Sequence, residues 1–270
     1  GRPFNLLSQL WQISVPGVIS RVLKDLEHIK RHSVSINTSI VNSTGNNKSN
    51  TPKSNLSNDT ILQCKVRDWR EHDIEYWNSY GITIEWLKFA EVYPISHKIV
   101  IKNGKQYVFG ADKYAYAYVE HKEGKVTLKI YQPFNTNGYK WANKHDSSVV
   151  SLWTKIPKSG KYVCICSSLK DALCLWCNTG IPAIAIQGEG YKMSQTAINE
   201  LKSRFEKVFI CLDNDKPGLE DSEKLAKSTG FINIILPQFE GGKDISDFFY
   251  SNHDKFNKVI LDLIKEKISE

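Results

Sequence analysis

The chain has 270 residues, 41% of them hydrophobic, and its 36 Lys and Arg against 29 Asp and Glu give a formal net charge of +7. A chain of this length holds one large domain or two small ones, and its basic character favours a polyanionic partner, although the basic residues are scattered. The sequence contains neither an apolar run of about 18 residues nor a secretory signal, so we expect no membrane contact and a cytoplasmic location.

Two segments precede the first predicted sheet. Residues 1–32 have apolar residues at helical spacing, interrupted near Pro16, and predict two short amphipathic helices. Residues 33–62 are rich in Ser, Asn and Thr, and we expect a flexible linker because so few apolar residues cannot offset the ordering entropy. Since the chain starts at Gly1 and its only methionine is Met193, we also expect it to be a fragment or a processed product.

Residues 63–157 predict a smaller subdomain of helices and an antiparallel sheet. The run from Val66 to Leu87 has helical spacing, with Asp73 as a plausible N-cap and Gly81 as the break between two helices. After this run the apolar period changes to two, which indicates strands joined by tight turns. The expected strands are 98–101, 106–110, 114–120 and 125–131.

Strands and helices alternate in residues 158–253, and a last helix is expected in residues 254–270. The strands, at 162–166, 183–186, 208–212 and 232–236, are short apolar runs separated by helical runs. This alternation predicts a parallel, Rossmann-like sheet flanked by helices and joined by right-handed crossovers. The fold class is therefore α/β for the C-terminal part and α+β overall.

Six cysteines are present, and two of them, Cys174 and Cys177, have the spacing of a zinc or redox pair. They lie within a helix-like run, however, and no second pair follows them, whereas a structural zinc ion needs four ligands. We therefore expect buried free thiols, which fits a reducing cytoplasm.

Two aspartates follow the third predicted parallel strand and form the strongest candidate site. Asp213 and Asp215 point the same way if the chain is extended, and their carboxylates would repel each other by about 4 kcal/mol at an effective dielectric constant of 20. A divalent cation removes that cost, and Mg²⁺ prefers oxygen ligands together with waters and substrate phosphates. The alternative for an isolated Asp-x-Asp pair is a solvated turn.

Polar residues follow the other predicted parallel strands as well, and in such a sheet these strand ends meet at the edge where ligands bind. The acidic residues that could share one site with the aspartate pair are Asp171, Glu189, Asp244 and Asp247. Singly, each is more often a helix cap or a surface charge, and Lys243 alone is more often solvated. Together they are better explained by a bound metal ion.

Residues 161–253 resemble a Toprim domain, the metal-binding catalytic fold of bacterial-type primases, topoisomerases and some nucleases. The resemblance depends on Asp-Asn-Asp-Lys-Pro-Gly at 213–218 and on Lys-Asp-Ile-Ser-Asp at 243–247. One position departs from the family pattern, in which a glutamate ends the first strand as Glu-Gly-x-x-Asp. This chain has Ser-Ser-Leu-Lys-Asp at 167–171, a form that some phage primases resemble. Glu189 could supply the missing carboxylate, but the usual general-base role is in doubt.

With residues 66–155 included, the resemblance becomes more specific: the chain resembles a primase of the phage type. The features are the aromatic helix with Glu-Tyr-Trp at 75–77, the antiparallel sheet, and Lys129-Ile-Tyr-Gln-Pro followed by Lys140-Trp141. In such primases basic residues before the Toprim part hold nucleotide phosphates, so Lys129 and Lys140 are candidates. The alternative is that they are exposed lysines of the sheet.

The resemblance implies a DNA primase, a DNA-directed RNA polymerase that makes short RNA primers in DNA replication by nucleotidyl transfer. It implies Mg²⁺ or Mn²⁺, a single-stranded DNA template, ribonucleoside triphosphates and a replicative helicase as partner. The N-terminal zinc domain of the family is expected to be absent. The implied roles are catalytic for Asp171, Glu189, Asp213 and Asp215, metal-binding for Asp213, Asp215, Asp244, Asp247 and Glu189, and nucleotide- or DNA-binding for Lys129, Lys140, Lys170 and Lys243.

Two other functions stay open from the sequence. A Toprim nuclease or topoisomerase is one, although no tyrosine is singled out as a DNA-linking nucleophile. A non-catalytic module that binds single-stranded DNA is the other, and the serine at the glutamate position favours it.

Overall fold

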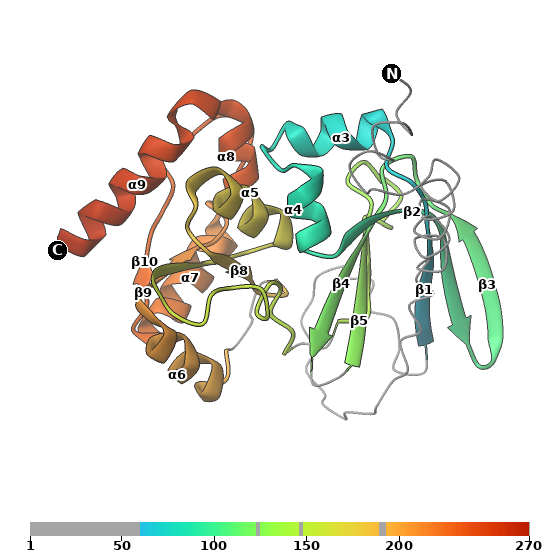
Figure 1. Cartoon of the computed structure of the whole chain (residues 1–270), viewed down its shortest axis with the longest axis horizontal. Coiled ribbons are helices and arrows are strands. Elements are labelled where there is room, and N and C mark those ends of the chain that lie inside the picture. The colour runs from blue at the N-terminus through green and yellow to red at the C-terminus, as the bar shows by residue number, and fades with distance from the viewer. Residues whose placement is uncertain (1–59, 123–124, 146–147, 189–192, 270) are drawn as a thin grey trace, which may run out of the picture. The chain divides into compact units, whose positions relative to one another are not determined.

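The computed structural model describes residues 60–122, 125–145, 148–188 and 193–269, all of them within one compact unit. The helices expected in residues 1–32, most of the linker expected at 33–62, and the candidate Glu189 lie outside these residues. The described chain contains two sheets, one antiparallel and one parallel (Figure 1). The fold class expected from the sequence is confirmed.

In the described part of the chain the antiparallel sheet has the strand order β1-β2-β4-β5-β6, with β3 also paired to β2. Its strands are β1 (Thr60–Val66), β2 (Val92–Lys102), β3 (Lys105–Gly110), β4 (Tyr116–Lys122), β5 (Lys125–Tyr131) and β6 (Trp141–Asn143). β1 and β6 are not predicted from the sequence. β1 alternates buried and partly exposed residues, but it follows the polar stretch without a break, and the linker predicted at 33–62 includes its first residues.

Two short helices, α3 (Glu71–Asn78) and α4 (Ile84–Phe89), separate β1 from β2. The break between them lies near Gly81, as expected: Gly81 has a φ of 68°, and a Cβ there would lie 2.3 Å from the Asn178 side chain. The N-cap of α3 is Arg70, so the expectation for Asp73 is wrong by one helical turn. Asp73 lies inside the first turn, where its carboxylate accepts the Arg70 N–H at 3.0 Å.

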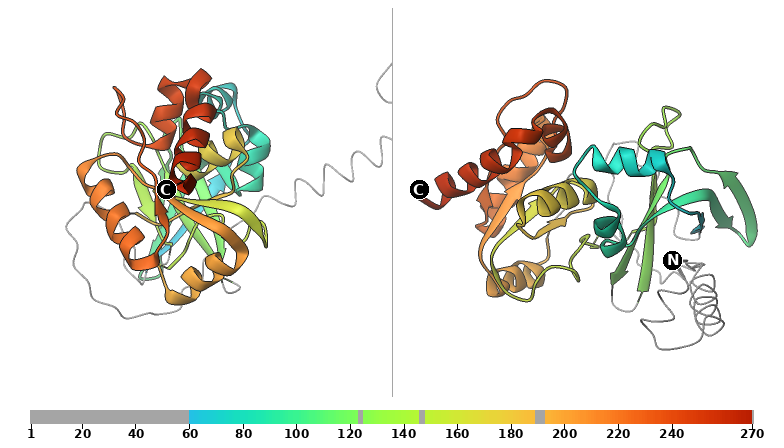
Figure 2. Two further views of the ribbon diagram at one scale, coloured as in Figure 1. Left: turned by 90° about the vertical axis from the view of Figure 1, so that its left-hand side faces the viewer. Right: turned by 45° about the horizontal axis from the view of Figure 1, so that its top comes forward.

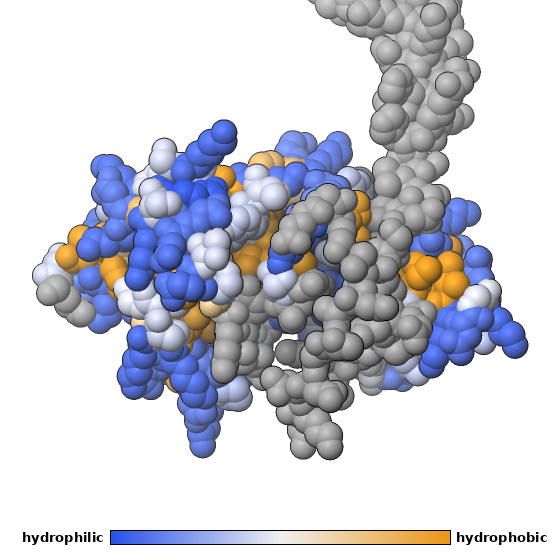
Figure 3. Space-filling model, turned by 90° about the horizontal axis from the view of Figure 1, so that it is seen from below, coloured by the Kyte–Doolittle hydropathy of each residue, from blue (hydrophilic) through white to orange (hydrophobic). Residues whose placement is uncertain are grey.

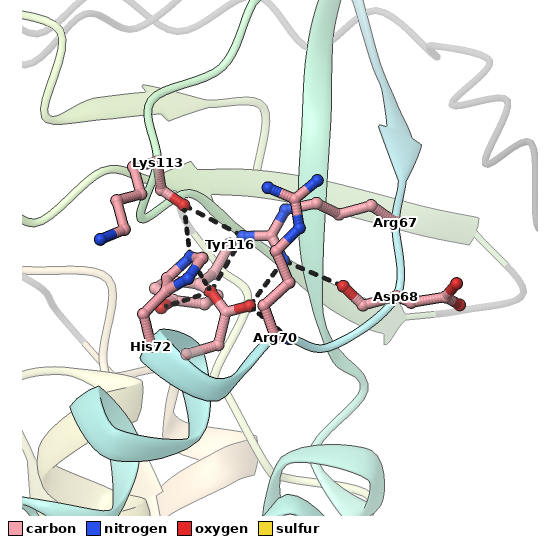
Figure 4. A network of polar contacts seen from close by, with 7 residues as sticks. Arg67, Asp68, Arg70, His72, Lys113 and Tyr116 are labelled. Carbon is pink, nitrogen blue, oxygen red and sulfur yellow. Dashed lines mark hydrogen bonds and ion pairs between the residues drawn. The ribbon is translucent and has the colours of Figure 1, made fainter.

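A buried ion pair fixes α3 to the antiparallel sheet (Figure 4). The Asp73 carboxylate is fully buried and accepts hydrogen bonds from both terminal nitrogens of Arg67, at 2.5 and 2.9 Å, and from the Tyr116 hydroxyl at 3.0 Å. The carbonyl oxygen of Lys113 accepts a hydrogen bond from Arg67 at 3.0 Å and lies 3.2 Å from the His72 ring nitrogen Nε2. These contacts join the chain after β1 to the start of α3 and to β4.

The parallel sheet has the strand order β10-β9-β7-β8 within the described residues, which confirms the predicted strand–helix alternation. Its strands are β7 (Gly160–Cys166), β8 (Ala183–Ala185), β9 (Phe205–Cys211) and β10 (Ile232–Asn233). From β7 the chain first adds β8 on one side and then returns to add β9 on the other. The strand order therefore reverses between β7 and β9, and ligands bind at such a switch point.

Helices cover the parallel sheet on both faces, since right-handed crossovers that run in opposite directions place their helices on opposite faces (Figure 2). They are α5 (Leu169–Thr179), α6 (Gln195–Arg204), α7 (Lys216–Thr229), α8 (Ile245–Ser251) and α9 (His253–Ser269). α5 packs on β7 and β8 and against α8 and α9, whereas α6 and α7 pack on β9. α8 and α9 thus extend the layer that α5 begins.

The two sheets share a hydrophobic core. Trp77 and Leu87 of the helical hairpin belong to the same buried cluster as Leu173 of α5 and Ile184 of β8. The chain between β6 and β7 reaches the outer edge of β8, where Ser151 and the backbone of Ala185 exchange hydrogen bonds of 2.8 and 3.1 Å. The antiparallel and parallel parts therefore share one continuous hydrophobic core.

Glu120 of β4 is buried beside this connection. Its Oε1 atom has no hydrogen-bond partner in the described structure. Burial raises the pKa of Glu120 from 4.5 to about 7, and the nearby Ser151 side chain and Leu152 backbone only partly oppose the rise. The protonated form is therefore favoured in the folded protein at mildly acidic pH.

We expect this group to make the protein less stable as the pH rises. Because the folded-state pKa exceeds the unfolded value, the unfolded state loses its proton first, and stability falls by up to about 3 kcal/mol between pH 4.5 and about 7. Urea unfolding from pH 5 to 8 should show this decline in the wild type and a smaller one in Glu120→Gln. The exposed Glu206→Gln on β9 is the control, and an equal decline in both variants would refute the assignment.

The cysteines agree with the expectation from the sequence. All six cysteines lie in the described residues and are free, five of them buried and Cys177 partly so. Burial raises the pKa of Cys64 and of Cys177 to about 12, so these thiols stay protonated. Among the helices that the structure describes, none has the length and apolar character needed to cross a bilayer.

β3 is the most exposed strand of the antiparallel sheet. Every residue from Lys105 to Gly110 is exposed, including the consecutive apolar residues Tyr107, Val108 and Phe109. Figure 3 shows hydrophobic surface among hydrophilic residues at the end of the molecule where β3 lies. Within the described chain β3 pairs with β2, and its other edge carries no strand.

Candidate active site

The ends of β7 and β9 are tied together by Ser167. Its hydroxyl oxygen accepts the backbone N–H of Asp213 at 2.9 Å, which fixes the start of the loop after β9. Ser167 stands at the position where the Toprim pattern has glutamate. In this chain a hydroxyl group therefore holds the backbone after β9 at this position.

Asp213 and Asp215 converge on one cation, the ammonium group of Lys243. Lys243 Nζ lies 3.0 Å from Asp213 Oδ2 and 2.5 Å from Asp215 Oδ2. The second oxygen of Asp215 caps α7 by accepting the Gly218 N–H at 2.9 Å. Gly218 allows this close approach, because a Cβ there would lie 2.2 Å from the Asp213 carbonyl oxygen. We call these three charged residues the Asp213–Lys243–Asp215 cluster.

The two carboxylates of this cluster differ in their electrostatics. Burial and the charge of Asp171 raise the pKa of Asp213, although Lys243 opposes the rise. Desolvation acts in the same direction on Asp215, but the hydrogen bonds from Lys243 and Gly218 outweigh it and lower the pKa of Asp215. The lysine stabilises both carboxylates in their charged form, and its own pKa is raised by them despite its desolvation.

Asp171 joins the start of α5 to the start of α8. Its carboxylate is 2% exposed and accepts hydrogen bonds from the Ser168 hydroxyl at 2.5 Å, from the Ser246 N–H at 3.1 Å, and from the Ser246 hydroxyl. These contacts give Asp171 a positioning role. Its catalytic role stays a prediction, supported only by the effect of its charge on Asp213 and Asp244.

Asp244 and Asp247 bind backbone N–H groups of their own loop. Asp244 is the N-cap of α8 and accepts the Asp247 N–H at 2.7 Å, and Asp247 accepts the Lys243 N–H at 3.2 Å. Burial and the charge of Asp171 raise the pKa of Asp244 to about 8, against the effect of Lys170. Within the described residues, no group of three or more acidic, His or Cys side chains is arranged to hold a metal ion. The metal roles of Asp244 and Asp247 therefore stay predictions.

The three remaining candidate lysines gather around aromatic side chains. Lys129 Nζ lies 4.4 Å from the ring centre of Trp141, and Lys140 Nζ lies 6.0 Å from that of Tyr131. The two rings stack with their centres 4.3 Å apart. Cations are attracted to the faces of such rings, so both lysines lie beside the same stacked pair, Lys129 on β5 and Lys140 directly before β6.

Lys170 lies between these aromatic side chains and the acidic strand ends. Its Nζ is 4.3 Å from the ring centre of Tyr80, and its charge also acts on Tyr131. Burial lowers the pKa of Lys170, but the charges of Asp244 and Asp171 outweigh burial and raise it. Lys170 thus lies near both the basic and the acidic candidate residues. Tyr80 is not predicted from the sequence as a site residue, because a single aromatic residue in a helical run carries no signal of its own.

Comparison with known proteins gives a domain family and a fold. Residues 164–249 match a family model described as Toprim-like. The sequence matched no curated protein. A structure of the Aquifex aeolicus primase with its zinc-binding and RNA polymerase domains is 14% identical, with a TM-score of 0.53, over 73% of this chain and 56% of that one. The present chain therefore spans little more than half of that primase structure.

Two further primase structures have similar folds. A DNA primase domain from Pseudomonas aeruginosa is 14% identical, with a TM-score of 0.53, and 71% of each chain is covered. A DnaG primase catalytic domain bound to single-stranded DNA is 13% identical, with a TM-score of 0.50, over 68% of this chain and 72% of that one. Residues 164–249 thus form a Toprim-like domain, in a chain that has the fold of DNA primase catalytic domains.

Proposed function

We propose that this chain is the catalytic part of a DNA primase, which joins ribonucleotides on a single-stranded DNA template. The observation that carries the proposal is the Asp213–Lys243–Asp215 cluster, two carboxylates that meet on one cation at the switch point of a Toprim-like sheet. The similar fold of a primase domain that was solved with single-stranded DNA supports the choice of template.

The residues of the cluster fit a divalent metal ion. Both carboxylates are partly accessible, with exposed side-chain fractions of 21% for Asp213 and 30% for Asp215, and both already bind a positive charge. Asp213 and Asp215 would hold Mg²⁺ or Mn²⁺ and leave its other positions to water and phosphate oxygens. When bound, such an ion stabilises the charge that develops on a transferring phosphoryl group. Glu189, Asp244 and Asp247 are proposed as further ligands because the sequence places them after the strands of the same sheet and because of the resemblance.

The lysines would bind the anionic substrates. Lys129, Lys140 and Lys170 bring three positive charges to the side of the acidic strand ends where Tyr80 and Tyr131 lie. They would attract the phosphates of a ribonucleoside triphosphate or of the template, and such binding weakens as the salt concentration rises. A replicative helicase as partner, a phage origin and a cytoplasmic location are further proposals, which rest on the resemblance.

The test is template-directed RNA synthesis by the purified chain. A short ribonucleotide oligomer annealed to single-stranded DNA, with labelled ribonucleoside triphosphates and Mg²⁺, bypasses the initiation step that a separate template-reading domain serves in related primases. We expect extension that requires the template and the metal ion. DNA binding that ignores Mg²⁺, with no extension, would instead support the non-catalytic module, and nicking of plasmid DNA without nucleotides would support a nuclease.

A further inference from the structure

We infer that Lys243 is a built-in counter-ion of the metal site: its ammonium group occupies the place between Asp213 and Asp215 that a divalent cation takes, and the incoming metal displaces it. The inference rests on the proposed function and adds a role for this lysine in controlling metal affinity. The lysine neutralises the two aspartates as long as no metal is bound. It also makes metal binding compete with an internal cation.

Hydrogen bonds fix the backbone of Lys243, whereas its side chain is able to move. Its carbonyl oxygen accepts the Asn214 N–H at 2.6 Å, and its own N–H donates to Asp247 at 3.2 Å. Its side chain is 48% exposed, and in the described structure the ammonium contacts are those to Asp213 and Asp215. The ammonium group can therefore move outward into water without breaking the contacts that hold the loop.

Both cations cannot occupy the same place. Each carboxylate presents to Lys243 Nζ, at 3.0 and 2.5 Å, the Oδ2 atom that would bind the metal. Mg²⁺ binds carboxylate oxygens at about 2.0–2.1 Å, so a metal ion on these atoms would lie almost in contact with the ammonium group and repel it strongly. Displacement of the lysine side chain is therefore part of metal binding.

The displaced ammonium group has a natural new partner in the substrate. It stays attached to a fixed backbone beside the metal ion, where the triphosphate of a nucleotide supplies negatively charged oxygens. Binding of the triphosphate would thus stabilise the displaced lysine and strengthen metal binding, and the metal ion would strengthen nucleotide binding to the same extent. Lys243 would couple the two ligands.

Two opposite effects of Lys243→Met distinguish this role from a structural one. We expect the variant to bind Mn²⁺ roughly tenfold more tightly than the wild type, because it lacks the competing charge. We expect it to bind an α,β-methylene analogue of ATP more weakly at saturating Mn²⁺, because it lacks the phosphate contact. A lysine that merely supported the loop would weaken both ligands when removed.

Mn²⁺ affinity is measured without any reaction, from the electron paramagnetic resonance signal of free Mn²⁺ in a titration of the whole chain. Lys216→Met is the matched control, since Lys216 is exposed and directly follows Asp215. It removes the same charge near the site without opening the space between the carboxylates. Thermal unfolding in the absence of metal checks that each variant is folded.

The outcomes separate the inference from the proposed function. Tighter Mn²⁺ binding by Lys243→Met, but not by Lys216→Met, supports the counter-ion role. Unchanged or weaker Mn²⁺ binding by Lys243→Met overturns it. If Asp213→Asn still abolishes Mn²⁺ binding in that case, the proposed metal site stands without the counter-ion. If Asp213→Asn has no effect on Mn²⁺ binding, both are wrong.

Discussion

Asp213→Asn is expected to abolish metal-dependent RNA extension and to leave the fold intact. Asparagine keeps the shape of the side chain and the backbone N–H that donates to Ser167, but it removes the negative charge that the metal needs. Mutation of a residue that only supports a metal ligand typically lowers metal affinity or activity by about 10- to 100-fold. Loss of a ligand itself should therefore lower the rate of extension by about 100-fold or more. Initial rates of extension over a range of Mg²⁺ concentrations measure this.

Glu220→Gln provides the matched control for Asp213→Asn. Glu220 lies on α7 in the same part of the chain, and its carboxylate is 3.9 Å from the Lys224 ammonium on the surface. Its removal takes the same charge from the protein without touching the cluster, so the rate should stay close to that of the wild type. Equal rates for Asp213→Asn and the wild type would end the proposed catalytic role.

Asp73→Ala is expected to have the largest effect on stability. It leaves the Arg67 guanidinium, whose side chain is 10% exposed, without its carboxylate partner and also removes the acceptor for the Tyr116 hydroxyl. Breaking a buried pair by removing one partner costs about 3–5 kcal/mol, because the remaining charge stays buried without compensation. Urea unfolding at neutral pH measures the free energy of unfolding of the variant and the wild type.

A double-mutant cycle attributes this cost to the ion pair. Arg67→Ala removes the other partner, and the double variant Arg67→Ala/Asp73→Ala should lose much less stability than the sum of the single variants, since the two residues share one network. Additive losses would show that Asp73 acts mainly through Arg70 and Tyr116. A loss below about 1 kcal/mol for Asp73→Ala would refute the importance of the pair.

The parallel sheet and its acidic edge could be predicted from the sequence, because both depend on the order of neighbouring segments along the chain. The short apolar runs alternate with helical runs, and Asp213 and Asp215 follow a strand whose end must lie at the ligand-binding edge. The direction of the strands and the convergence of the two carboxylates follow from these facts without any knowledge of distant contacts.

The partners of the acidic residues could not be predicted, because they come from segments far apart in the chain. Lys243 lies 28 positions after Asp215, and Ser246 lies 75 positions after Asp171. No spacing rule predicts which of two nearby charges, Lys243 or Asp244, reaches the aspartate pair. Similarly, the sequence predicts Asp73 as the N-cap of α3, whereas the helix begins one turn earlier and the Asp73 carboxylate pairs with Arg67.

Asp213 and Asp215 are proposed to be ligands of one divalent metal ion. A crystal of the chain soaked in Mn²⁺, with diffraction data collected at the manganese absorption edge, locates that ion directly by its anomalous signal. We expect one peak bonded to both carboxylates, with the Lys243 ammonium moved away from them. The absence of a peak beside these two side chains would contradict the metal site. A peak there with Lys243 still bridging the carboxylates would contradict only the counter-ion role of the lysine.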